Sequence, residues 1–409
     1  MKNILNFIIL LLTLISCKNS GIGDSPVLKY PLKIQLDLND ATVDSMNLSD
    51  IALDIEYIPL QTTDSALLGY FWDFGVTTNY YFIKDGSDIL VFDKNGQYVS
   101  NLFKVGVGPG EAFAYCFTVD EKNELVYVYD NKSINVKIFN FNGKYIKTIN
   151  SPIAPYEYWT YSIGYFNNYL FVHTAQRPFV KYLYSCFNLR NDSINILYKN
   201  HREYDKSQEN KSPLAPLDYH YQITDSSILF KERFSDTIIS ANKNLDQYPR
   251  YIVGLGEQKL DWLGWRDHGM FNIAGGPPPG YQVQSFVETK SFLFLVLKSF
   301  REPQIFVVFN KTTNKAGIFK NTEVKTNAQV WVKNDLDGIA PFTPMNRSGY
   351  LFYHDDCLYC VLEAKEFSDA YGTASEQNKT STKYLRKMAP AFSSVNEFSN
   401  PVIMKVHLK

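Results

Sequence analysis

The sequence lacks an excess of charge of either sign. Its 409 residues include 41 Lys and Arg against 42 Asp and Glu, which gives a formal net charge of −1. Proteins that bind nucleic acid normally carry a basic excess, so this balance argues against a nucleic-acid partner. Long apolar runs are also missing after residue 15. A membrane-spanning helix needs about 20 consecutive apolar residues, so we expect no such helix in the rest of the chain.

The usual metal and catalytic motifs are absent as well. No histidine falls in HExxH or another paired metal spacing, and no GxSxG nucleophile motif is present. We therefore predict no metal and no cofactor. A catalytic triad assembled from distant loops leaves no such local signature, so enzyme activity stays open. The six histidines are His173, His201, His220, His268, His354 and His407.

The amino terminus has the pattern of an export signal. A basic Lys2 precedes a short apolar run, and Leu14-Ile15-Ser16-Cys17 resembles the lipobox of bacterial lipoproteins. This implies a signal peptide at residues 1–16, acylation of Cys17, a polar tether at 17–27 and one domain at 28–409. The alternative is an ordinary secretory peptide with an incidental Cys17. We expect an envelope protein anchored through Cys17, at the outer membrane, facing either the periplasm or the cell surface.

The other cysteines read as structural. Cys357 and Cys360 have the CxxC spacing, but two cysteines do not complete a zinc site. They fall in an expected strand, where residues i and i+3 point to opposite faces, too far apart for a disulfide. We expect these two, with Cys116 and Cys186, to be buried apolar side chains, with a redox or metal role as the alternative.

A repeat with a period near 47 residues determines the expected fold. Asp88–Val99 alternates apolar and polar residues into an Asn-Gly turn, and Asn135–Ile146 repeats the pattern 47 residues later. Leu183–Leu197 gives a third, weaker copy, with Asn191-Asp192 in place of Asn-Gly. Three looser copies follow at 236–242, 304–311 and 401–408, each preceded by another apolar run.

Short strands at this period are typical of β-propeller blades. We predict an all-β, six-bladed propeller in which Asp54–Gln61 supplies the missing outer strand of the last blade. The alternatives are a five- or seven-bladed ring, or two stacked sandwiches.

Two insertions interrupt the period. The first carries Trp262, Trp265, Arg266, His268 and, further on, Tyr281. Aromatic faces beside polar groups suit a ligand pocket, so we propose these five residues as a ligand-binding set. The alternative is that the tryptophans pin the loop to the blade. In the second insertion, residues 375–390 have a helical pattern and predict one short surface helix near the carboxyl terminus.

Several sequence segments, in a fixed order, resemble segments of the six-bladed β-propeller lipoproteins common in Bacteroidetes-type bacteria. They are Phe92–Gly96 with the "GxGPGE" segment Val105–Glu111, then Phe234–Ile238 with Pro249–Tyr251, then Asn334–Gly338 with Pro341-Phe342, and finally the ending Asn400–Lys409. The resemblance spans most of the chain after the tether. It implies the fold and an envelope location, and it implies no defined activity.

Two motifs resemble ligand-binding loops, but we expect both to have a structural role. The segment Gly106, Gly108, Pro109, Gly110 and Glu111 lacks the Lys-Ser/Thr of a phosphate loop, and its acid would repel phosphate. We expect these glycines to serve the passage between two blades.

The second motif is a partial calcium loop. Asp335, Asp337 and Gly338 match its start, but residues 340–342 bring no carboxylate. A capped turn is expected there, and Asp355-Asp356 is expected to be a solvated turn.

These observations favour a non-catalytic binding or scaffolding protein for a glycan, a peptide or an envelope protein. A polysaccharide hydrolase or lyase is the alternative, by analogy with other propellers. Glycosidases need two carboxyl groups across a cleft, which a sequence with 42 acidic residues neither supports nor rejects. A third possibility is a structural subunit, which would expose a broad apolar patch.

Overall fold

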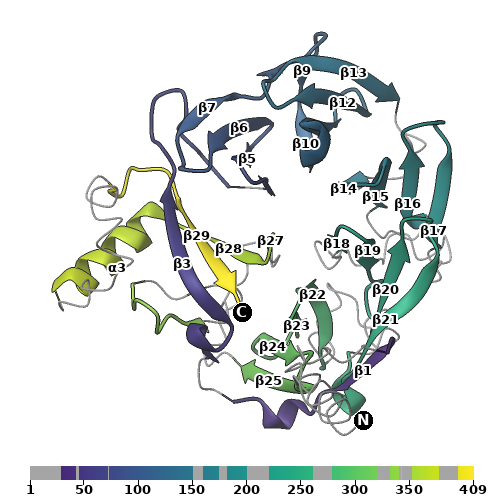
Figure 1. Ribbon diagram of the computed structural model, residues 1–409, viewed down its shortest axis with the longest axis vertical. Helices are drawn as coiled ribbons and strands as arrows, with labels where there is room; N and C mark the ends of the chain where they lie inside the picture. Colours follow the sequence, from purple (N-terminus) through teal and green to yellow (C-terminus); the bar gives the residue numbers. More distant parts are fainter. Residues whose placement is uncertain are drawn as a thin grey trace, which may run out of the picture.

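The computed structural model describes residues 29–42, 46–71, 73–150, 160–174, 182–199, 221–260, 279–320, 332–339, 342, 352–376 and 395–409. Within these ranges the chain forms a ring of six antiparallel sheets around a central axis (Figure 1). The predicted six-bladed propeller is therefore confirmed. Two short parallel pairs lie outside the blades, β8 (Lys104–Val105) with β9 (Glu111–Ala112), and β2 (Met46–Asn47) with β26 (Val332–Lys333).

The first three blades follow one another along the chain. Blade 1 contains β4 (Asp73–Val76), β5 (Tyr80–Asp85), β6 (Asp88–Asp93) and β7 (Tyr98–Asn101). Blade 2 contains β10 (Ala114–Asp120), β11 (Leu125–Asp130), β12 (Asn135–Asn140) and β13 (Tyr145–Asn150). Blade 3 contains β14 (Thr160–Phe166), β15 (Tyr169–Thr174), β16 (Tyr182–Asn188) and β17 (Ile194–Lys199).

The other three blades complete the ring. Blade 4 contains β18 (Tyr221–Ile223), β19 (Ser227–Phe230), β20 (Thr237–Asn242) and β21 (Gln247–Gly254). Blade 5 contains β22 (Gln282–Glu288), β23 (Phe292–Lys298), β24 (Ile305–Asn310) and β25 (Lys315–Lys320). Blade 6 contains β27 (Phe352–His354), β28 (Cys357–Leu362), β29 (Val402–Leu408) and β3 (Ala52–Pro59).

Blade 6 joins the two ends of the chain, as predicted. Strand β3 pairs antiparallel with β29 from Val402 opposite Pro59 to Leu408 opposite Ala52 (Figure 1). The backbone N–H of Lys409 adds a hydrogen bond to Ile51 O at 2.9 Å. This pairing covers the edge of β29, which would otherwise offer a row of unpaired backbone groups to other chains.

The chain before β3 forms a strap around the outside of blades 4 and 5, which the sequence pattern did not predict. Strand β1 (Leu32–Gln35) adds a parallel fifth strand to blade 4, beside β21. After the 3₁₀ turn η1 (Leu38–Asp40), Thr42 bridges to Phe319 of blade 5. The strap then reaches β2, the turn η2 (Leu48–Asp50) and blade 6.

The repeat follows from the positions that the blades bury. Phe92, Phe139 and Phe187 occupy equivalent places in the third strands of blades 1 to 3, and each is at most 5% exposed. At the turn after the third strand, Gly96 and Gly143 have φ of +80° and +76°. A Cβ on Gly96 would overlap the carbonyl oxygen of Pro59 in the neighbouring blade. Asp192 takes this positive-φ place in blade 3, with φ of +56°.

The two faces of the ring differ in the length of their loops. One face carries the loops from first to second and from third to fourth strands, and none is longer than the segment 189–193. We call it the short-loop face. The opposite face, here the insertion face, carries every longer connection between consecutive strands of the blades, including residues 255–281 and 363–401.

One short helix is present near the carboxyl terminus, as expected. Helix α3 covers Ala364–Glu376, directly after β28, and packs Phe367 against Tyr57 with ring centroids 5.4 Å apart. Of the predicted helix at 375–390, residues 377–390 lie outside the described residues. Among the described helices, none is both long and apolar enough to cross a membrane.

Closure by β3 gives a first prediction. A fragment of residues 60–409 should fail to form a stable monomer, because the edge of β29 is then exposed. A fragment of residues 46–409 lacks β1 but keeps β3, so it should stay monomeric with a lower melting temperature than 29–409. Size-exclusion chromatography and thermal melting by circular dichroism measure both effects. A monomeric 60–409 fragment with an unchanged melting temperature would contradict the role of β3.

Candidate functional site

A cavity of about 1200 Å³ opens at the short-loop face and is lined by residues of all six blades. Its wall is formed by the loops between first and second strands, such as Thr78 in blade 1, Asn167 in blade 3 and Thr289 in blade 5. Since these loops surround the axis, we call the cavity the central funnel. It is large enough for a small organic ligand or a few residues of a peptide, since ligand pockets measure roughly 300–1000 Å³.

Charges of opposite sign occupy opposite halves of the funnel. Blades 3 to 5 contribute five cations and two carboxylates, namely Arg190, Lys243, Arg250, Lys290, Lys311, Asp225 and Glu288. Blades 6, 1 and 2 contribute four carboxylates and one lysine, namely Asp120, Glu121, Asp355, Asp356 and Lys122. The first group, the cationic arc, carries a formal charge of +3, and the second, the acidic arc, carries −3 with His354 neutral.

A buried ion cluster fixes part of the cationic arc. Arg250 donates to both oxygens of Glu288, from Nε at 3.1 Å and from Nη2 at 2.7 Å, and Lys311 Nζ lies 3.1 Å from Oε1. Burial raises the pKa of Glu288, but the hydrogen bond from Arg250 and the charge of Lys311 hold it below the ordinary value. Two cations on one carboxylate give the cluster a net charge of +1. The cluster joins blade 4, through Arg250, to blade 5.

Three other cations of the arc are exposed at the rim. The side chains of Arg190, Lys243 and Lys290 line the funnel, and none has an ion-pair partner within the described part of the chain. They belong to blades 3, 4 and 5 in order. Their charges are therefore available to a ligand, whereas those of Arg250 and Lys311 are shared with Glu288.

The acidic arc is held by contacts within blades and between them. Glu121 accepts a hydrogen bond from Thr78 N of blade 1 at 2.7 Å and lies 3.6 Å from His354 Nε2 of blade 6. Asp120 accepts from Asn123 in the turn η3 (Glu121–Asn123), and Asp356 accepts from Tyr353 OH at 2.8 Å. These contacts fix the carboxylates in place.

The family model described as a domain of unknown function, DUF4934, matches residues 33–407. The chain belongs to the DUF4934 family. The match covers the whole described ring, from β1 to β29.

The fold is shared with a solved structure from Bacteroides fragilis. A presumed exported protein from Bacteroides fragilis has a TM-score of 0.63 and 15% identity, over 92% of this chain and 99% of that chain. A DUF4221 family member from Bacteroides vulgatus has a TM-score of 0.48 and 11% identity, over 88% and 97%. The comparison with curated proteins found no match. For this member of the DUF4934 family, such identities establish the fold alone.

Below the funnel, the inner strands bring several ionisable groups together near the axis. Burial raises the pKa of Asp73, at the start of β4, to about 6, against a weaker lowering effect of Lys84. Burial likewise lowers the pKa of Lys84 and raises the pKa values of Cys116 and Tyr221, both of which feel the charge of Asp73. Blades 1, 2 and 4 thus share one poorly solvated polar region.

The cysteines are buried free thiols, as the strand pattern predicts. Cys357 faces the core between blades 6 and 1, and Cys360 faces the core between blades 5 and 6. The sequence analysis missed one contact: Cys357 Sγ lies 3.4 Å from His407 Nδ1, whose Nε2 lies 2.8 Å from Glu56 Oε1. Burial raises the pKa of Cys357 to about 11, so the thiol stays protonated at neutral pH, and this chain of groups lacks an activated nucleophile.

The glycine-rich segment between blades 1 and 2 folds around Glu111. Its carboxylate accepts a hydrogen bond from Gly108 N at 2.9 Å, and a Cβ on Gly106 would overlap it. Of the glycines in this segment, Gly110 has the positive φ, at +78°. Pro109 lies within the same turn, between β8 and β9.

The partial calcium motif also forms a capped turn. Asp337 Oδ1 accepts from Asn334 Nδ2 at 2.6 Å, from Ile339 N at 3.0 Å and from Tyr57 OH at 3.2 Å. Asp335 accepts from both the backbone N–H and the hydroxyl of Ser49. Across the described residues, no cluster of three or more His, Cys, Asp or Glu side chains is placed to hold a metal.

Most of the predicted ligand-binding set cannot be placed. Trp262, Trp265, Arg266 and His268 lie outside the described residues. Tyr281 is buried and donates to Pro303 O at 3.2 Å. The five residues therefore remain a prediction.

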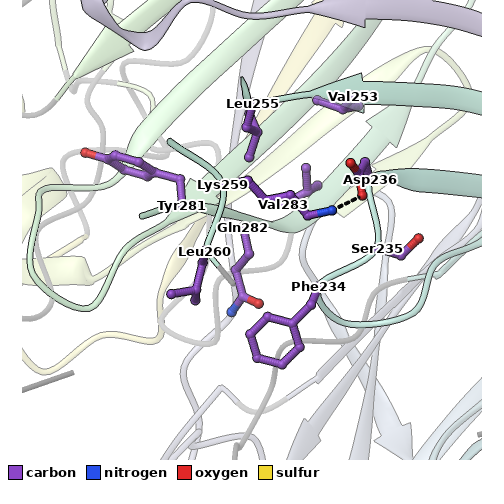
Figure 2. A pocket seen from close by; sticks show the side chains of 10 residues that line it. All are labelled: Phe234, Ser235, Asp236, Val253, Leu255, Lys259, Leu260, Tyr281, Gln282 and Val283. Atoms are coloured by element: carbon purple, nitrogen blue, oxygen red, sulfur yellow. Dashed lines mark hydrogen bonds and ion pairs between the residues drawn. The ribbon is translucent and has the colours of Figure 1, made fainter. Parts of the chain in front are cut away.

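A small pocket lies where the first insertion leaves blade 4 and returns to blade 5. Figure 2 shows its lining, with Tyr281 at one side and Lys259 reaching Asp236 in an ion pair of 2.5 Å. Its volume is about 10 Å³, which is at the limit for one water molecule. The pocket is on the insertion face, opposite the funnel, and is too small for a sugar or a peptide.

Asp73 gives a second prediction, about pH. Its folded pKa of about 6 exceeds the unfolded value of about 3.9, so the folded state holds the proton longer and stability falls as pH rises from about 4 to about 6. Asp73→Asn should remove this decline and raise the free energy of unfolding at pH 7 by about 1–3 kcal/mol. Urea unfolding at a series of pH values measures it. The exposed Asp64→Asn is the control, and parallel pH profiles for Asp73→Asn and the wild type would contradict the prediction.

Proposed function

We propose that this DUF4934 protein is an exported, lipid-anchored binding protein whose central funnel holds a peptide segment. The observation that supports it best is the separation of charge in the funnel, +3 on blades 3 to 5 and −3 on blades 6, 1 and 2. A rigid cavity with fixed charges of both signs orients a ligand that carries both signs. Peptides have this property through their termini and side chains, and neutral glycans lack it.

Export is supported by two independent features. The first 16 residues have the pattern of a signal peptide, with Cys17 at the lipobox position. The structurally similar Bacteroides fragilis protein is described as exported. A bacterial envelope location follows, with the acyl chains of Cys17 as the membrane contact and the predicted outer membrane as the site.

The lining of the funnel also favours binding over polysaccharide cleavage. Its described aromatic side chains are Tyr165, Phe166 and Tyr353, whereas charged and amide groups dominate the rest. Its carboxylates belong to hydrogen-bonded turns or to the ion cluster at Glu288. Glycoside hydrolysis needs a general acid with a raised pKa and a second carboxyl group across the cleft. Carboxylates that are held in turns and ion pairs suit the binding of a charged ligand better than this chemistry.

One observation keeps the hydrolase alternative in view. Asp73 has the raised pKa expected of a general acid, and it lies on an innermost strand of the ring. If the protein is a hydrolase, Asp73→Asn will abolish release of reducing sugar from envelope polysaccharide while leaving the fold intact. A binding protein shows no such release in the wild type.

Neutralising the exposed cations of the cationic arc gives a third prediction. In the soluble fragment 18–409, replacing Arg190, Lys243 and Lys290 by Gln should weaken binding of the best ligands from a hexapeptide library by about threefold or more, since each exposed pair contributes roughly 0.2–1 kcal/mol. Isothermal titration at low and high salt measures the change, which added salt should reduce.

The control has the same charge change on the outer strands: Lys33, Lys147 and Lys315, all exposed, are replaced by Gln. It should bind as the wild type does. Tight binding to neutral glycans on an array, unchanged in the Arg190, Lys243 and Lys290 variant, would overturn the peptide proposal.

The anchor gives a fourth prediction. Cys17→Ala should shift the protein from the membrane fraction to the soluble fraction, because the acyl chains contribute about 0.8 kcal/mol for each buried methylene. Fractionation with immunoblotting and metabolic labelling with palmitate measure this. Continued membrane association of Cys17→Ala would refute acylation as the anchor.

A further inference from the structure

We infer that the short-loop face, with the mouth of the funnel, faces the membrane, and that the cationic arc contacts anionic phosphate headgroups there. This inference rests on the proposed lipid anchor at Cys17. It adds an orientation and a second partner, the lipid surface, to the proposed peptide-binding role.

The first argument is where the described chain enters the ring. Tyr30 lies against Arg250, with the guanidinium 3.8 Å from the ring centroid, and Arg250 lines the funnel. Strand β1 then runs parallel to β21, with Leu32 beside Tyr251 and Gln35 beside Gly254. Since β21 begins at the short-loop face, the chain enters from that face and runs toward the insertion face.

The second argument is the reach of the tether. Eleven residues lie between Cys17 and Lys29, and the twelve steps from one Cα to the next span about 40 Å when fully extended and roughly 20 Å as a flexible coil. If the insertion face lay on the membrane, this segment would have to turn back and pass Tyr251–Gly254, the half of β21 that β1 covers. Those residues span about 13 Å at 3.3 Å per residue. That arrangement uses much of the relaxed reach of the tether, whereas no reversal of the chain is needed when the short-loop face is down.

The third argument is electrostatic. The exposed rim cations Arg190, Lys243 and Lys290 lie on blades 3, 4 and 5, and the chain enters at blade 4. The edge that the tether holds closest to the bilayer is therefore the positive one. Anionic lipids attract such side chains by about 1 kcal/mol each near the surface.

The acidic arc leads to a tilt. Asp355 and Asp356 of blade 6 and Glu121 of blade 2 are repelled by the same lipid charge that attracts the opposite rim. The ring should then lean on blades 3 to 5 and lift blades 6, 1 and 2. The gap on the acidic side leaves a route for a ligand into a funnel that otherwise faces the membrane.

The experiment uses the full acylated protein in vesicles and is the fifth prediction. Single cysteines for a fluorophore replace exposed residues at three places: Asn244 on the short-loop face of blade 4, Asn95 on the same face of blade 1, and Lys132 on the insertion face. The native thiols of the described residues are buried. Vesicles are phosphatidylethanolamine alone or mixed with phosphatidylglycerol, each with a quencher on a fraction of the headgroups.

We expect quenching in the order Asn244, then Asn95, then none at Lys132, with the difference between Asn244 and Asn95 increased by phosphatidylglycerol. Replacing Arg190, Lys243 and Lys290 by Gln should remove that increase without detaching the protein. The outer-strand variant of Lys33, Lys147 and Lys315 should keep it.

The outcomes separate the two proposals. Failure of the wild type to attach to vesicles overturns the anchor and the orientation together. Attachment with quenching at Lys132 equal to or above that at Asn244 overturns the orientation and leaves the anchor standing. If phosphatidylglycerol does not change the difference in quenching between Asn244 and Asn95, the proposed contact with anionic headgroups is wrong.

Discussion

The pairing of β3 with β29 is the constraint on which the rest of the structure depends. It joins strands from the two ends of the chain, from Val402 opposite Pro59 to Leu408 opposite Ala52. The core between blades 6 and 1, which contains Ile58, Tyr81 and Ile403, forms only when this closure places the two blades side by side. The central funnel needs it too, because blades 1 and 6 form adjacent parts of its wall.

The strap before β3 also supports the wall of the central funnel. Tyr30 packs on Arg250, and Arg250 holds Glu288 with Lys311, so the chain before the first blade supports the wall between blades 4 and 5. Glu288 stays ionised although it is buried, because two cations lie within hydrogen-bonding distance of its carboxylate. The ion cluster therefore holds blades 4 and 5 together at the centre of the cationic arc. The exposed side chains of Arg190, Lys243 and Lys290 extend from blades 3, 4 and 5 around it.

The fold could be predicted from the sequence to a large extent, and the site could not. Phe92, Phe139 and Phe187 recur at a regular spacing because each blade buries the same position. This local pattern predicts the blades, and the strand left over before the first repeat predicts the closure of the ring. Strand β1 was missed because four residues in parallel pairing leave no local signature. The start of helix α3 at Ala364 was not predicted, because Phe367 is held there by a tertiary contact with Tyr57. The funnel combines single loop residues from six blades, and their meeting depends on the ring alone.

The unequal faces of the ring have a consequence for how related proteins can differ. Between consecutive strands of the blades, all connections longer than the segment 189–193 are on the insertion face, where the chain can lengthen without crossing the axis or disturbing a strand. The short-loop turns are fixed by neighbouring blades, as Gly96 is by Pro59. Homologues should therefore diverge in length on one side of the ring while conserving geometry on the other, so that recognition on each side evolves independently.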